Sequence, residues 1–135
     1  MGSEMCIRDR PITKLAEVLE DNTRFIGIHF FSPVDKMNLV ELIKSERTND
    51  TALAVALDYT SLIKKTPIVV NDSRGFYANR CIIPYINEGL RMLSEGIEPA
   101  LVENAAKQIG MPVGPLQLLD ELSVSLALNL SLIHI

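Results

Sequence analysis

Apolar and polar positions in the first part of the chain are arranged as in α/β proteins. A short apolar face follows Pro11 and predicts a helix, and residues 25–30 form an apolar, β-rich run that predicts a buried strand. A turn at Pro33 separates this run from a second predicted strand at residues 38–44. We expect the second strand to return alongside the first.

The next segment repeats helix and strand. A polar stretch offers Asn49 or Asp50 as the N-cap of a helix that runs to about Lys65. The buried side of this helix is expected to contain Leu53, Val55, Ala56, Tyr59, Leu62 and Ile63. Residues 67–70 then form a short strand that begins with proline, which places it near a sheet edge or at a strand start. Helix followed by strand, twice over, predicts a parallel sheet.

The second half of the chain predicts helices only. Residues 76–94 have a helical apolar stripe that ends at Gly96, and Pro84 inside it predicts a kink or a break. Proline at the start and glycine at the end predict a second helix at residues 99–110. A third, largely apolar helix is expected at residues 116–130.

These patterns divide the chain into four parts. Residues 11–74 are expected to be α/β and residues 75–130 all-α. Residues 1–10 have no apolar periodicity, and residues 131–135 continue a helical pattern without a cap, so we expect both ends to be non-native sequence. A chain cut at both ends is the simplest interpretation.

Composition argues against several classes of function. The chain is 47% apolar and 22% charged, which is typical of a packed protein. Its net charge of -4 and the absence of a basic cluster argue against nucleic-acid binding. No apolar run is long enough to insert into a membrane. Cys6 and Cys81 lack the spacing of a zinc site or a disulfide framework, so no metal is expected and a reducing compartment is favoured.

Each of the two strands joined at Pro33 carries one ionisable residue in an apolar setting, His29 in the first and Glu41 in the second. Two such groups in adjacent buried strands are costly unless they pair. We interpret His29 as a catalytic base and Glu41 as the carboxylate that orients it. A lone histidine in an apolar strand is more often a core residue bonded to a backbone carbonyl, so this interpretation depends on Glu41.

Five short motifs extend this interpretation. They are His29-Phe-Phe-Ser-Pro33, Met37-Asn-Leu-Val-Glu41, Thr66-Pro-Ile-Val-Val-Asn-Asp72, Gly75-Phe-Tyr-Ala-Asn-Arg80 and Gly110-Met-Pro-Val-Gly-Pro115. In this order and spacing they resemble the 3-hydroxyacyl-CoA dehydrogenase family, and within it the dehydrogenase part of multifunctional fatty-acid oxidation complex α-subunits. The resemblance covers about residues 11–130.

The resemblance implies a fold, a reaction and a set of site residues. The fold would be the C-terminal part of a Rossmann-like NAD-binding domain, followed by the first helices of a helical C-terminal domain. The reaction would be NAD-dependent oxidation of L-3-hydroxyacyl-CoA to 3-ketoacyl-CoA in fatty-acid β-oxidation. His29 matches the catalytic histidine of the family, Glu41 its paired carboxylate, Asn79 a substrate-binding residue, and Ser32 a position that approaches the nicotinamide. Without the resemblance, Asn79 is better explained as an N-terminal or helix-surface amide, and Ser32 is equally well explained as a turn residue.

One feature of the family is absent from this sequence. The dinucleotide fingerprint G-x-G-x-x-G does not occur, and it would be expected upstream of Pro11. We therefore expect a central fragment that is inactive alone. The resemblance further implies an acyl-CoA substrate, a homo-oligomer or a fatty-acid oxidation complex, and a cytoplasmic location, or the mitochondrial matrix in a eukaryote.

Two other functions stay open at this point. One is a related dehydrogenase that acts on a hydroxy acid without CoA. The other is a non-catalytic module of the same fold that mediates structure or self-association. His29 and Glu41 argue against the non-catalytic module, because a structural protein has no need of a buried ionisable pair.

Overall fold

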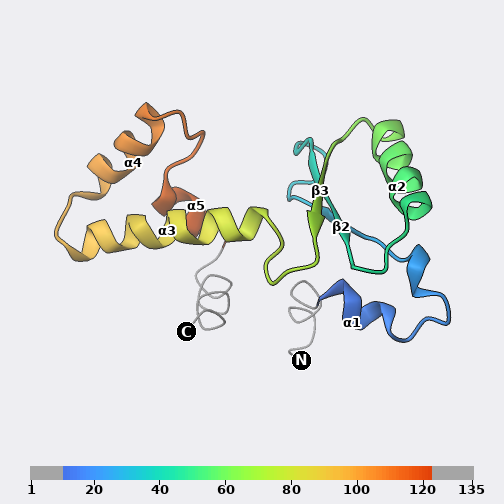
Figure 1. Cartoon of the computed structure of the whole chain (residues 1–135). Helices are drawn as coiled ribbons and strands as arrows, with labels where there is room; N and C mark the ends of the chain where they lie inside the picture. Colours follow the sequence, from blue (N-terminus) through green and yellow to red (C-terminus); the bar gives the residue numbers. More distant parts are fainter. Residues whose placement is uncertain (1–10, 123–135) are drawn as a thin grey trace, which may run out of the picture. The chain divides into compact units, whose positions relative to one another are not determined.

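The computed structural model describes residues 11–122 (Figure 1), and contacts divide the chain into two compact units, Met1–Tyr77 and Ala78–Ile135. The first unit contains α1 (Ile12–Ala16), a 3-10 turn η1 (Asn22–Arg24), β1 (Gly27–Phe30), β2 (Leu39–Lys44), α2 (Asp50–Leu62) and β3 (Thr66–Asn71). The second unit contains α3 (Ala78–Ser94), α4 (Pro99–Gln108) and α5 (Pro115–Leu122). An α/β segment followed by helices is therefore confirmed across the described residues. The interpretations of residues 1–10 and 131–135 lie outside them.

The three strands form a mixed sheet in the order β1–β2–β3. β1 and β2 are antiparallel, and β2 and β3 are parallel. The returning strand expected after Pro33 is thus confirmed, whereas the prediction of a parallel sheet is wrong for β1 and β2. The connection, residues 31–38, is too short for a parallel crossover, which needs roughly a dozen residues or more.

Helix α2 covers one face of the sheet and lies beside β2 and β3 (Figure 1). Asn49 is its N-cap, as predicted, and its side chain accepts a hydrogen bond from the amide of Ala52 at 2.8 Å. The residues that contact the sheet or are buried with it recur at helical spacing: Leu53, Ala56, Leu57 and Thr60. The buried hydroxyl of Thr60 donates to the carbonyl groups of Ala56 and Leu57, which satisfies it inside an apolar layer.

The predicted buried side of α2 is wrong for three residues. Val55, Tyr59 and Leu62 are 63%, 46% and 80% exposed. At 100° per residue, Val55 and Leu62 lie roughly 160° and 180° around the helix from Leu53, and Tyr59 lies roughly 160° from Leu57. Within the part of the chain that the structure describes, the helix therefore packs through one side, although its sequence is apolar on both.

The second face of the sheet packs against α1 and the segment that follows β3. Its buried cluster consists of Ile12, Ile43 and Phe76. A Cβ atom at Gly27 would lie 2.9 Å from Cγ2 of Ile12, so glycine allows α1 to approach β1 this closely. Because alternate strand residues point to opposite faces, His29 and Glu41 lie on the same face as Gly27.

The second unit follows the predicted helix limits closely. α3 continues through Pro84 without a break, and Gly96, with a φ of +87°, follows its end. α4 begins at Pro99, and Gly110, with a φ of +97°, follows it as predicted. The predicted continuation of α5 to about residue 130 lies outside the described residues. Within residues 11–122 no helix is both long and apolar enough to cross a membrane.

Side chains from α3 and α4 hold the start of α5. The carboxylate of Glu103 accepts the backbone N–H groups of Leu116 and Gln117, at 2.8 and 3.3 Å, and so caps the first turn of α5. The hydroxyl of Tyr85 donates to the carbonyl oxygen of Val113 at 2.8 Å. Burial, and to a smaller extent the nearby Glu103 carboxylate, raise the pKa of Tyr85, so its phenol stays a donor at neutral pH.

Replacing Gly89 with alanine is expected to lower the free energy of unfolding by about 1–3 kcal/mol. An alanine Cβ would lie 2.6 Å from Cγ of Pro115, which forces α3 and α5 apart. In an unobstructed helix the same change would add about 1 kcal/mol of stability, so the close contact reverses the sign. Urea unfolding measures the effect, with Asn87→Ala at an exposed position of α3 as the control. A Gly89→Ala protein at least as stable as the parent would contradict this packing.

Candidate active site

The structure brings His29 and Glu41 together. They are directly opposite each other in the β1–β2 pair, and Nδ1 of His29 lies 2.6 Å from Oε2 of Glu41. The Glu41 side chain is fully buried, whereas 28% of the His29 side chain is exposed. Solvent, or a substrate, therefore reaches the pair through the histidine, while the carboxylate stays in the interior.

The chemistry of the two groups determines which one donates and which one accepts in this hydrogen bond. An ionised carboxylate only accepts, so Nδ1–H of His29 donates to Glu41. In the neutral imidazole the other nitrogen, Nε2, is then the acceptor. Oε2 of Glu41 would lose this hydrogen bond if the imidazole carried its only proton on Nε2, so Glu41 favours the tautomer protonated at Nδ1. The arrangement can take up a proton at Nε2 and stabilise the imidazolium that results.

Three groups contact the pair although the sequence did not lead us to predict these contacts. The backbone N–H of Tyr77 donates to Oε1 of Glu41 at 3.0 Å. The rings of Phe31 and Phe76 lie 4.9 and 5.9 Å from the imidazole of His29, measured between ring centroids. Strand alternation could have identified Phe31, which follows His29 by two residues. Nothing in the local pattern indicates Phe76 or Tyr77, because they come from a turn that follows β3.

The connection between the two site strands is fixed at its base. The ammonium group of Lys65, just before β3, donates to the carbonyl oxygens of Val34 and Met37, at 2.5 and 2.7 Å. This ties residues 31–38 to the start of β3. Ser32 lies in this connection and is exposed. Its approach to a nicotinamide stays a prediction.

Asn79 is the second residue of α3, in the second unit, and is half-buried. Its predicted contact with a substrate stays a prediction, as does its alternative role as a helix-surface amide. Within residues 11–122, no group of three or more His, Cys, Asp or Glu side chains is arranged to hold a metal ion.

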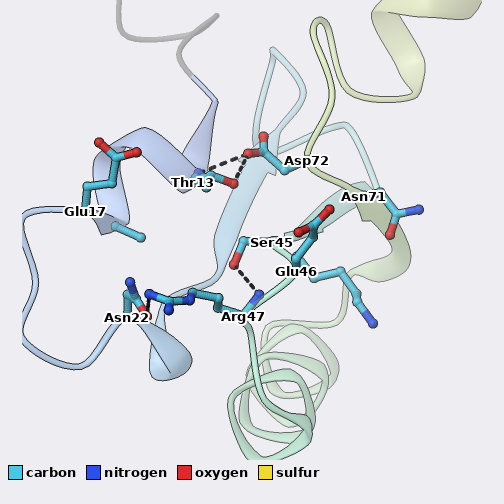
Figure 2. A pocket seen from close by; sticks show the side chains of 10 residues that line it. Thr13, Glu17, Asn22, Ser45, Glu46, Arg47, Asn71 and Asp72 are labelled. Atoms are coloured by element: carbon cyan, nitrogen blue, oxygen red, sulfur yellow. Dashed lines mark hydrogen bonds between the residues drawn. The ribbon is translucent and has the colours of Figure 1, made fainter.

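A hollow of about 720 Å³ lies at the carboxyl ends of β2 and β3 (Figure 2). Cations and carboxylates line it together: Lys44, Arg47, Glu17, Glu46 and Asp72. Asp72 already accepts the backbone N–H groups of Ile12 and Thr13, at 3.1 and 3.0 Å, and so fixes α1 to the end of β3. Neither His29 nor Glu41 lines this hollow, and its mixed charge favours no single class of ligand. We therefore place the candidate active site at the histidine–glutamate pair.

Comparison with protein families gives two matches that together span nearly the whole chain. The model of the 3-hydroxyacyl-CoA dehydrogenase NAD binding domain matches residues 9–73. The model of the 3-hydroxyacyl-CoA dehydrogenase C-terminal domain matches residues 75–133. The NAD binding domain match precedes the C-terminal domain match, which is the order that the sequence motifs led us to expect.

Solved structures show the same likeness. (S)-3-hydroxybutyryl-CoA dehydrogenase PaaH1 from Ralstonia eutropha is 40% identical with a TM-score of 0.86, and the alignment covers 91% of this chain and 44% of that one. FadB2 from M. tuberculosis is 30% identical with a TM-score of 0.82, over 89% of this chain and 43% of that one. 3-Hydroxybutyryl-CoA dehydrogenase from Escherichia coli K12 is 29% identical with a TM-score of 0.85, over 91% of this chain and 26% of that one.

The chain thus spans less than half the length of each of these three relatives. Two of the three are 3-hydroxybutyryl-CoA dehydrogenases. The comparisons therefore do not single out the multifunctional α-subunits to which the sequence motifs pointed.

Proposed function

Because the chain belongs to the 3-hydroxyacyl-CoA dehydrogenase family, we propose that it forms part of an NAD-dependent oxidoreductase that converts L-3-hydroxyacyl-CoA to 3-ketoacyl-CoA. The observation that carries this proposal is the hydrogen bond between His29 and the buried Glu41. Oxidation of a secondary alcohol requires a base for the hydroxyl proton, and a partly exposed imidazole backed by a buried carboxylate is suited to that task.

In the proposed reaction Nε2 of His29 takes the proton of the 3-hydroxyl group as the hydride leaves C3. Glu41 stabilises the positive charge that develops on the imidazole, and it fixes the ring so that Nε2 faces the substrate. When bound, NAD⁺ supplies the hydride acceptor. The fully buried position of Glu41 supports this division of roles, because a carboxylate screened from water stabilises the imidazolium more strongly than an exposed one.

The described residues do not by themselves complete a dinucleotide site. The sequence contains no G-x-G-x-x-G turn, which in Rossmann-like domains brings backbone N–H groups to the pyrophosphate. Residues 9–73 match the NAD binding domain model without that turn. We therefore propose that this chain supplies the base that takes the hydroxyl proton, and we assign none of its residues to binding the pyrophosphate.

Two further residues are proposed to contact the ligands. Asn79 would donate its amide to the substrate oxygen at C3 and so favour the change in charge there. Ser32, in the connection after β1, would approach the nicotinamide. We also propose an acyl-CoA substrate, a role in fatty-acid β-oxidation, a homo-oligomer or oxidation complex, and a cytoplasmic or, in a eukaryote, mitochondrial matrix location. That the chain belongs to the dehydrogenase part of a multifunctional α-subunit stays a prediction, narrower than the family assignment.

Oxidation of NADH by the full-length gene product tests the reaction and the substrate class together. With acetoacetyl-CoA we expect a kcat/KM at least about 100-fold above that with free acetoacetate, because contacts with the CoA portion contribute to transition-state binding. Similar values for the two substrates would favour a dehydrogenase for hydroxy acids without CoA. No turnover of either substrate would favour a non-catalytic module.

A further inference from the structure

The turn that follows β3 has an unusual backbone. Gly75 and Phe76 are consecutive left-handed residues, with φ values of 72° and 49°. Glycine adopts this conformation freely, but a bulky side chain such as phenylalanine rarely does. A strained residue of this kind persists only where its surroundings fix it, and such residues gather at functional sites.

The strained turn brings two consecutive residues into contact with His29 and Glu41, the pair that we call the dyad. Phe76 is buried against Ile12 and Ile43, and its ring centroid lies 5.9 Å from that of His29. The next residue, Tyr77, donates its backbone N–H to Oε1 of Glu41 at 3.0 Å. One residue thus packs against the base, and its neighbour bonds the carboxylate that orients the base.

The hydrogen bond from Tyr77 acts on the oxygen of Glu41 that does not face His29. With Oε1 held by a backbone N–H and Oε2 lying 2.6 Å from Nδ1 of His29, rotation of the carboxylate about its last bond would break both hydrogen bonds. The backbone N–H of Tyr77 can only donate, so Oε1 of Glu41 is the acceptor in this bond. The ring of Phe76, together with that of Phe31, restricts the imidazole itself.

We propose that Phe76 is a positioning residue for the dyad: its left-handed conformation, fixed by burial of its ring, delivers the N–H of Tyr77 to Glu41 and holds the imidazole of His29 in one orientation. The catalytic meaning of this role rests on the proposed function, whereas the structural role stands without it. The competing explanation is that Phe76 only fills the cluster on this face of the sheet.

Phe25 provides a matched control, because it packs against the same cluster of Ile12, Ile43 and Phe76. In the full-length gene product, Phe76→Leu is expected to lower kcat by about 10- to 100-fold with KM within about twofold, since a small misplacement of the base is costly. Phe25→Leu should lose comparable thermal stability with kcat within about threefold. Phe76→Met replaces Phe76→Leu in the series if the leucine variant does not fold.

A spectroscopic test does not depend on activity. In the parent protein we expect the Tyr77 amide to be protected from hydrogen exchange, and ¹⁵N shifts of neutral His29 to show one tautomer, protonated at Nδ1. His29→Gln assigns the imidazole signals by their loss. In Phe76→Leu the amide protection should fall and the two tautomers should mix, while Phe25→Leu should preserve both signals.

Unchanged protection and tautomer in Phe76→Leu would overturn the positioning role, as would equal losses in Phe25→Leu. A parent protein that shows both signals, and loses them in Phe76→Leu, but does not oxidise NADH with acetoacetyl-CoA would leave the positioning role standing and remove the proposed function. The two proposals therefore fail separately.

Discussion

Replacing His29 with glutamine is expected to lower kcat for the proposed 3-hydroxyacyl-CoA oxidation by about 10²- to 10⁴-fold, the range that a positioned general base contributes. Glutamine has a similar reach and can donate its amide to Glu41, so the buried carboxylate keeps a partner. It cannot take up a proton near neutral pH. The fold and the affinity for NADH should therefore survive while proton transfer is lost.

Steady-state kinetics of the full-length gene product measure this effect, and a fluorescence titration with NADH supplies the control for cofactor binding. The melting temperature should stay close to that of the parent, because His29 is partly exposed and belongs to neither apolar cluster. If the variant keeps more than a tenth of the parent kcat, His29 is not the base.

The position of the pair on the sheet could be anticipated from sequence because strand periodicity is strict. In β2, Val40 and Leu42 pack towards α2, and Glu41 between them must face the other side. A shift of the β1–β2 register by one residue would place His29 opposite an apolar side chain instead of Glu41. The short connection around Pro33 favours the antiparallel direction, and the alternation of apolar residues specifies which residues face each side, so local information was sufficient.

The buried side of α2 could not be anticipated in the same way. Its sequence is apolar around most of the circumference, so periodicity does not distinguish Ala56 and Thr60 from Val55, Tyr59 and Leu62. Which side packs is decided by the sheet, through contacts that are distant in sequence. Thr60 is the clearest case, because its hydroxyl is satisfied within the helix and its burial has no apolar signal.

The groups that support the dyad could not be predicted from the sequence either, for a different reason. Tyr77 contributes a backbone N–H, which every residue except proline has, so no residue type marks it. The left-handed conformation of Phe76 is equally invisible, because sequence rules assign φ > 0 to glycine, as at Gly75 beside it. Sequence motifs identified this segment as part of the family, but only the structure shows which atoms reach Glu41.

Replacing Glu41 with glutamine is expected to lower kcat by about 10²- to 10⁴-fold, although the substitution keeps the size and shape of the side chain. The amide can donate to Nδ1 of His29, which favours the tautomer with the proton on Nε2 and removes the acceptor that the substrate needs. Loss of the negative charge also removes the stabilisation of the imidazolium in a buried setting. The effect should fall on kcat, with KM within about threefold, because the interaction strengthens only in the transition state.

The control for this variant is Glu46→Gln, the same chemical change at an exposed residue of the loop that follows β2. It should leave kcat and KM unchanged, since it alters net charge equally without contacting the dyad. ¹⁵N spectra of His29 supply an independent readout: the parent should be protonated at Nδ1 and Glu41→Gln at Nε2. A Glu41→Gln enzyme with parent kcat and the parent tautomer would show that the carboxylate is a structural partner of His29 and does not orient a base.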